Sequence, residues 1–142
     1  MTNRFIWAAL LSLSFLGSCH RYDLSVSKLP SDARDLASTY VGTPDPRPAP
    51  IGEKLLIDWR IPRLMVQEGA SLRLSLLYWN YTEEIISYPI DSWIGYKVYR
   101  LVNEECAERK GLLTYKAEIV QQDGTVFKEW QHQLFVNLID IQ

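Results

Sequence analysis

The sequence predicts an all-β fold, an antiparallel sandwich of about six to eight short strands preceded by an extended tether. Three observations support this prediction. Apolar and polar residues alternate with a period of two along several segments after Gly52, as in strands with one face in a core. Turn-forming residues separate these segments at short intervals. No segment shows a sustained helical period.

The predicted strands each place apolar residues on one face. Leu55, Ile57 and Trp59 alternate with mostly polar neighbours, and the pattern continues to Ile61 before Pro62 ends the strand. The same alternation recurs in later segments, so each is expected to have one face in the core. These further segments are 72–78, 86–90, 96–101, 112–120 and 126–139.

Turn residues join some of these strands. The run Asn80–Glu83 predicts a hairpin between the second and third predicted strands. Asp123-Gly124 predicts another hairpin, because glycine accepts the positive φ that a tight turn requires. The apolar pattern of the last segment changes phase between Trp130 and Phe135, which predicts a β-bulge.

Three of the predicted strands resemble strands of a known class of domain. Residues 55–62, 95–100 and 113–118 look like strands B, C and F of fibronectin type III and related immunoglobulin-like domains. The resemblance implies an immunoglobulin-like sandwich. The gap between the first two segments is longer than in that family, so residues 71–90 are expected to add a hairpin. No binding residues are carried over, since a fold does not fix a function.

The amino terminus has the pattern of an export signal. Arg4 precedes an apolar run of 12 residues, Phe5–Leu16, which is shorter than the ~20 residues of a transmembrane helix. Leu16-Gly17-Ser18-Cys19 follows and resembles the lipobox of bacterial lipoproteins. The resemblance implies removal of residues 1–18 and attachment of a diacylglycerol and a third acyl chain, palmitate among them, to Cys19.

The resemblance also implies a location. In Gram-negative lipoproteins, aspartate after the lipidated cysteine favours the inner membrane, and this chain has His20 there, which implies the outer membrane. An ordinary cleaved signal peptide, with Cys19 free or in a disulfide with Cys106, is the alternative. Cys106 itself lies in a charged stretch predicted to be a loop or short helical turn. A half-buried apolar role is expected for it, ahead of an intermolecular disulfide or a nucleophile.

The chain is expected to have three parts: a lipoprotein signal peptide at 1–18, a lipidated, proline-rich tether at 19–50 and a β-sandwich domain at 51–142. Four of the seven prolines alternate with other residues over 44–50, which favours an extended, polyproline-like spacer. Residues 32–40 have the alternatives of a brief helix or an edge strand, but no regular structure is expected.

Composition and motifs give no indication of an enzyme. With 15 Lys and Arg against 17 Asp and Glu, the formal charge of −2 argues against a nucleic-acid partner. No metal-binding, nucleotide-binding or nucleophile motif is found, so no catalytic residue, metal or cofactor is predicted. His132 is expected to be an ordinary strand residue, because no general-base arrangement surrounds it in the sequence. The acidic residues 104, 105 and 108 predict a solvated turn, ahead of a calcium site.

Clustered aromatic residues are the predicted binding feature. Tyr78, Trp79 and Tyr81 are nearly consecutive, so they do not all face one core on a strand. They either fill a small core or form a surface that anchors a partner. The leading hypothesis is therefore a non-enzymatic outer-membrane lipoprotein that binds another envelope or surface protein. The alternative is a lipid- or glycan-binding carrier or sensor with a cavity between its sheets, and an enzyme is the third option.

Overall fold

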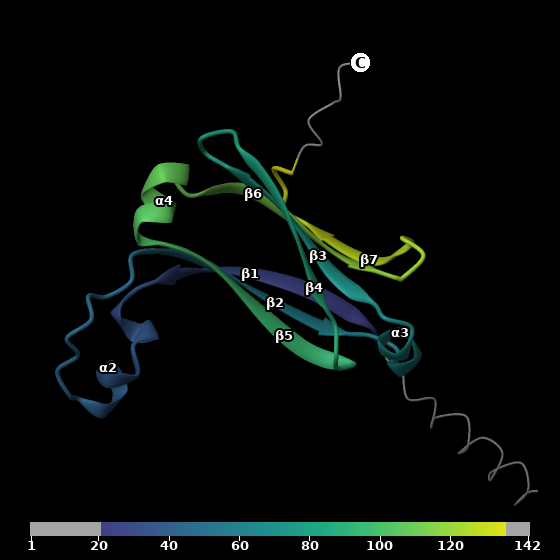
Figure 1. The fold of residues 1–142 in the computed structure, drawn as a ribbon, viewed down its shortest axis with the longest axis horizontal. Coiled ribbons are helices and arrows are strands. Elements are labelled where there is room, and N and C mark those ends of the chain that lie inside the picture. The colour runs from purple at the N-terminus through teal and green to yellow at the C-terminus, as the bar shows by residue number, and fades with distance from the viewer. Residues whose placement is uncertain (1–20, 136–142) are drawn as a thin grey trace, which may run out of the picture.

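The computed structural model describes residues 21–135, which form two antiparallel sheets packed face to face (Figure 1). One sheet has the order β1-β2-β5, with the strands Asp23–Ser31, Gly52–Arg60 and Ile94–Val102. The other has the order β4-β3-β6-β7, with the strands Glu83–Pro89, Ser71–Tyr78, Leu112–Val120 and Val126–Gln131. Short helices lie between strands: η2 (Ala33–Asp35), α2 (Ala37–Val41), α3 (Arg63–Gln67) and α4 (Asn103–Arg109). The prediction of an all-β sandwich is confirmed.

The period-two pattern places the core where the sequence predicts it. Leu55, Ile57 and Trp59 of β2 are buried, and in β3 every second side chain from Leu72 to Tyr78 is buried. These side chains meet between the sheets in one apolar cluster. Full burial of each large aliphatic side chain contributes roughly 1.5–3 kcal/mol, so this cluster is the main stabilising element of the fold.

In immunoglobulin-like sandwiches, strands A, B and E share one sheet and strands C, F and G share the other. The assignments of β2 to strand B and β6 to strand F are consistent with this order. The assignment of residues 95–100 to strand C is wrong, because β5 pairs with β2, with Leu55 opposite Tyr99, and takes the place of strand E. The hairpin of β3 and β4 supplies C and C′. Alternation shows which face of a strand is buried and leaves its neighbours undetermined.

Both predicted hairpins are present. β3 pairs with β4 through the turn at residues 79–82, and β6 pairs with β7 through Asp123-Gly124, where Gly124 has φ of 88°. The bulge lies elsewhere than predicted. The strand register shifts between Ile119 and Val120, opposite the start of β7, and between Leu77 and Tyr78, where β3 pairs with β6. β7 ends at Gln131, so the phase change that begins at Trp130 marks the end of a strand, and residues 136–139 lie outside the described residues.

The predicted tether contains a strand of the sandwich. β1 pairs with β2 at all nine of its positions, and Leu24 and Val26 enter the core. The prediction of a spacer is therefore wrong for residues 23–31. Of the other seven positions of β1, five carry Ser, Lys or Pro and five are exposed, which an edge strand tolerates and which conceals the strand in the sequence.

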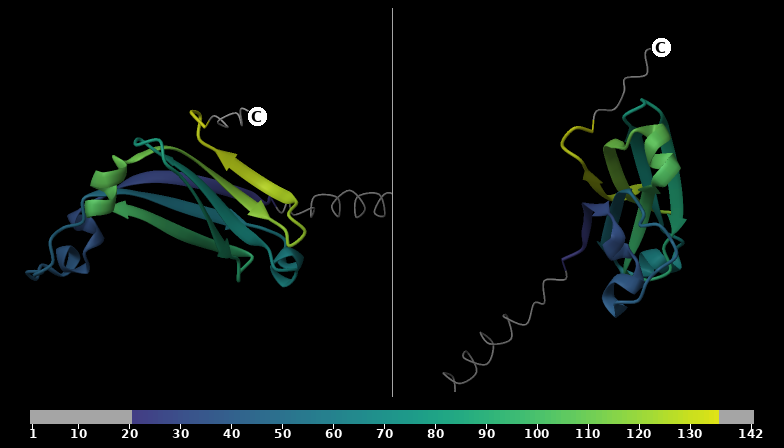
Figure 2. Two further views of the ribbon diagram at one scale, coloured as in Figure 1. Left: turned by 45° about the horizontal axis from the view of Figure 1, so that its top comes forward. Right: turned by 90° about the vertical axis from the view of Figure 1, so that its left-hand side faces the viewer.

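The proline-rich segment also lies in an unexpected place. Residues 32–40, expected to lack regular structure, form η2 and most of α2. The alternating prolines follow in the connection from α2 to β2. This connection lies at the end of the sandwich opposite Arg21, where the described chain begins (Figure 2). The proline-rich segment therefore does not separate the amino terminus from the body.

A buried carboxylate links side chains of two neighbouring strands, β3 and β6, on the outer face of the four-stranded sheet. Glu118 of β6 is 4% exposed and accepts hydrogen bonds from Arg73 Nε at 2.8 Å and Lys116 Nζ at 2.9 Å. Burial alone would raise the pKa of Glu118, but the hydrogen bonds from Arg73 and Lys116 outweigh burial and lower it. The ionised carboxylate therefore stabilises the folded state.

We predict that a chain starting at residue 51 fails to fold, whereas a chain starting at residue 21 folds. Without β1, one edge of β2 and the core around Leu24 lose their cover. Thermal unfolding followed by circular dichroism checks this. A cooperative transition at the same temperature in both chains would contradict the role assigned to β1.

We predict that Glu118→Gln lowers the free energy of unfolding at pH 7 by about 1–3 kcal/mol, because two charged donors lose their ionised acceptor. Since the folded pKa of Glu118 is lowered, its contribution is present above the unfolded value of about 4.3 and is lost as pH falls below it. Urea unfolding at pH 7 and pH 4 should show that the free energy of unfolding falls less on acidification in the variant than in the original protein. The exposed Glu83→Gln is the control, and equal effects from both variants would refute the assignment.

Candidate functional site

The end of the sandwich opposite Arg21 presents large apolar side chains to solvent. We call it the distal end and define it as Ile51, the turn 79–82, α4 and the segment 110–111 (Figure 1). Ile51, Trp79 and Tyr81 are 76%, 52% and 75% exposed. Exposed aromatic and branched aliphatic residues gathered in one place are typical of binding surfaces.

Backbone hydrogen bonds fix the turn that carries the two aromatic rings. Trp79 N donates to Gly111 O at 3.0 Å, and Asn80 N donates to Arg109 O at 3.2 Å, so the turn rests on the end of α4. Asn80 Oδ1 also accepts from the amide of Thr82 at 3.1 Å and from its hydroxyl at 2.6 Å. Trp79 and Tyr81 are therefore held in position by secondary structure on both sides of the turn.

A polar network lies beneath this turn. Tyr78 is fully buried, and its hydroxyl donates to Glu84 Oε2 at 2.6 Å and lies 2.7 Å from the Tyr99 hydroxyl. Arg109 Nη1 donates to the same Glu84 oxygen at 2.7 Å, and the Arg109 guanidinium lies 4.2 Å from the centre of the Tyr78 ring. Burial and the hydrogen bonds to Glu84 and Tyr99 raise the pKa of Tyr78. The network joins β3, β4, β5 and α4.

Unusual backbone conformations gather at the distal end. In residues 21–135 the non-glycine residues with positive φ are Tyr81, Asn103 and Lys110, with φ of 64°, 55° and 62°. All three belong to the distal end. A left-handed backbone outside glycine costs of order 1 kcal/mol or more and persists where surrounding contacts impose it. Such residues concentrate at functional sites.

A shallow apolar depression of about 660 Å³ adjoins Trp79. Its lining combines apolar residues and glycine with polar ones: Ile51, Cys106, Ala107 and Gly111, together with Glu53, Asn103, Glu104 and Lys110. Lys28 Nζ lies 2.6 Å from Glu53 Oε2 and forms an ion pair with it. The geometry of this contact is not that of a hydrogen bond. The surface beside the exposed rings is thus concave and largely apolar.

Cys106 has the environment that the sequence predicts for it. It lies in α4, is half-buried and packs against the core. Burial, and then the charge of Glu53, raise the pKa of the Cys106 thiol. A raised pKa keeps the thiol protonated at neutral pH, which suits an apolar packing role and is the opposite of what a nucleophile needs.

The structure separates the three aromatic residues singled out in the sequence. Tyr78 belongs to the core, whereas Trp79 and Tyr81 lie at the surface. Tyr78 is the last residue of β3 and faces the core, whereas Trp79 and Tyr81 lie in the turn that follows, and partner binding by these two residues stays a prediction. Cys19 lies outside the described residues. In the described range no helix has the length and hydropathy to cross a membrane.

His132 lies just beyond β7 and makes local contacts. Its Nδ1 is 3.4 Å from the Thr114 hydroxyl, and its ring lies 4.9 Å from that of Tyr115. Within residues 21–135 no carboxylate is hydrogen-bonded to its ring, and no three potential metal ligands gather at one point. These contacts support a structural role for His132.

The sequence matches no protein-family model, and no curated protein or solved structure is significantly similar to it.

We predict that Tyr78→Phe lowers the free energy of unfolding by about 1–3 kcal/mol, because Glu84 loses a donor and the Tyr99 hydroxyl loses its buried partner. Since the folded pKa of Tyr78 is raised, its contribution is present below the unfolded value of about 10 and is lost as pH rises above it. Urea unfolding at pH 7 and pH 10.5 measures both effects. The exposed Tyr96→Phe is the control, and an equal response would disprove the network's role.

Proposed function

We propose that the protein is an envelope lipoprotein that catalyses no reaction: acyl chains on Cys19 hold it in the outer membrane, and its distal end binds another envelope or surface protein. The observation that carries this proposal is the exposed surface of Ile51, Trp79 and Tyr81 beside an apolar depression, at the end opposite Arg21. An anchor next to Arg21 would direct this surface away from the membrane.

The distal end has the properties of a protein-binding surface. Aromatic anchors beside a pocket dominate the binding energy of many interfaces. The turn that carries Trp79 and Tyr81 is already ordered by Gly111 and α4, so binding would cost little conformational entropy. The exposed acids of α4, Glu104, Glu105 and Glu108, border the surface and favour a partner that presents cations.

The interior of the sandwich favours this proposal over the carrier hypothesis. A carrier needs a cavity of several hundred Å³ between its sheets. The space between the sheets is occupied by buried side chains of both, such as Ile57 of β2 and Leu74 of β3. These side chains belong to a packed core, and the depression at the distal end lies outside it.

We predict that a photoreactive residue at position 79 of the full chain crosslinks in intact cells to one discrete protein, identified by mass spectrometry. The same residue at Ile85, which is exposed on β4, gives no such adduct. The adduct falls more than about tenfold when Ile51→Glu is added, the effect expected at an interface anchor.

Other outcomes would count against the proposal. A lipid adduct at position 79 would favour a carrier, and the absence of a protein adduct would remove the interaction surface. The anchor is tested separately. Intact-mass analysis should find a chain that starts at Cys19 with added acyl mass, and Cys19→Ala should leave the membrane fraction. A Cys19→Ala chain that stays in the membrane would refute the lipoprotein assignment.

A further inference from the structure

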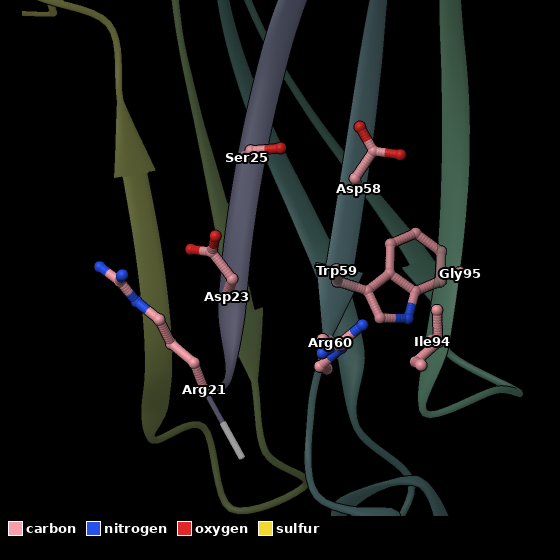
Figure 3. A pocket seen from close by; sticks show the side chains of 8 residues that line it. All are labelled: Arg21, Asp23, Ser25, Asp58, Trp59, Arg60, Ile94 and Gly95. Carbon is pink, nitrogen blue, oxygen red and sulfur yellow. The ribbon is translucent and has the colours of Figure 1, made fainter. Parts of the chain in front are cut away.

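A second depression, of about 420 Å³, lies at the opposite end of the sandwich, where the described chain begins (Figure 3). Asp23 extends from β1, Asp58 and Arg60 extend from β2, and Arg21 comes just before β1. The strand register places Asp23 opposite Arg60. Two cations and two carboxylates therefore line one shallow site, which we call the proximal site, and the Arg21 side chain extends on the far side of Asp23 from Arg60 (Figure 3).

The charged groups of the proximal site are open to a ligand. Within residues 21–135, none of these four side chains takes part in a salt bridge. Asp23 Oδ1 accepts one local hydrogen bond, from the amide of Leu24 at 2.9 Å. Two guanidinium groups without carboxylate partners suit a phosphate, and carboxylates suit an ammonium group.

Trp59 and Gly95 form the rigid side of the proximal site. The Trp59 indole reaches toward β5 in Figure 3, and its Nε1 donates to Ser92 O at 2.9 Å. A Cβ atom at Gly95 would lie 2.7 Å from Trp59 Cζ2, so only glycine lets the indole occupy this place. The indole is nearly buried and packs on the backbone of Gly95. It therefore forms a wall of the site, and its ring face is not available to a ligand.

The position of the proximal site follows from the proposed lipid anchor. Only His20 separates Cys19 from Arg21. Two residues span at most about 7 Å, at roughly 3.3–3.6 Å per residue. The polar layer on each side of a bilayer is about 5–8 Å thick, from the difference between the full and the hydrocarbon thickness. Arg21 would therefore lie at the level of the phospholipid headgroups.

We propose that the proximal site binds the headgroup of a membrane phospholipid that carries both a phosphate and a primary ammonium group, as in phosphoethanolamine lipids. Arg60 binds the phosphate, Arg21 reaches the phosphate by turning its side chain toward the site, and Asp23 and Asp58 bind the ammonium group. This proposal rests on the lipid anchor of the proposed function. Two methylene groups separate phosphate from ammonium in this headgroup, and the outward side chains of Asp58 and Arg60 are about 7 Å apart along β2.

The side chains favour a primary ammonium group over a quaternary one. Proteins bind choline with open aromatic faces. The proximal site offers carboxylates, which accept hydrogen bonds from a primary ammonium group, and the Trp59 ring is only 8% exposed. An anionic headgroup without an ammonium group would leave Asp23 and Asp58 unmatched. The site therefore distinguishes three classes of phospholipid.

The test uses the full chain extracted from membranes in detergent micelles. Phospholipids with identical acyl chains and ethanolamine, choline or glycerol headgroups are added in turn, and bound lipid is measured by native mass spectrometry. We expect the ethanolamine lipid to bind at least about tenfold more tightly than either of the others, the difference expected from one charge-assisted hydrogen bond. Equal binding of the three lipids would overturn the proposal.

Matched variants locate the binding. Arg60→Ala and Asp58→Asn should each reduce the preference by about tenfold. Arg100→Ala removes an exposed arginine at the far end of the same sheet and should leave it unchanged. These positions are exposed, so melting temperatures should stay the same. A reduced preference for the ethanolamine lipid in Arg100→Ala, or an unchanged preference in Arg60→Ala, would show that the lipid binds elsewhere.

The same spectra separate this proposal from the lipoprotein assignment. The mass of the protein reports whether Cys19 carries acyl chains, independently of any bound lipid. An acylated chain without the ethanolamine preference would overturn the proximal site and leave the anchor intact. A chain without acyl mass that still prefers the ethanolamine lipid would support the site's chemistry and overturn the anchor.

Discussion

The pairing of β1 with β2 determines how the rest of the molecule is arranged. Nine consecutive residue pairs, from Asp23 opposite Arg60 to Ser31 opposite Gly52, fix the start of the chain at the α3 end of the sandwich. The same pairing sends the chain along the whole length of the sheet, so that α2 and the proline-rich connection lie at the other end. With an anchor at Cys19, no spacer separates the membrane from the body.

The two ends of the sandwich differ in chemistry, and this difference suggests a different binding partner for each end. At the distal end, Trp79 and Tyr81 are exposed on a turn that Gly111 and Arg109 hold in place. At the proximal end, charged side chains surround a shallow site beside Arg21. The sandwich sets the separation of the two ends, and the proposed function assigns the proximal end to the membrane and the distal end to a partner.

The sequence predicts the fold class and the core well, because alternation reports burial directly. It places Leu55, Leu72 and Leu74 inside, as the structure does, whereas it leaves Tyr78 between the core and a binding surface. Strand partners are not predicted, since β3 and β5 are both expected as strands from local sequence, and only long-range pairing places them in different sheets. β1 escapes detection because an edge strand keeps few apolar residues. The proximal site is not predicted from the sequence either. Its charged residues occupy ordinary outward-facing strand positions, and only the register between β1 and β2 brings them together.

The orientation of the sandwich on the membrane is the central claim, and fluorescence quenching tests it most directly. The full, lipidated chain carries one fluorophore, at Leu64 of α3 or at Ile51, in vesicles that contain a phospholipid with a spin-labelled headgroup. A nine-residue strand spans about 30 Å, far beyond the contact range of such a quencher. We expect strong quenching of the fluorescence at position 64 and little quenching at position 51. Equal quenching, or stronger quenching at position 51, would contradict this orientation.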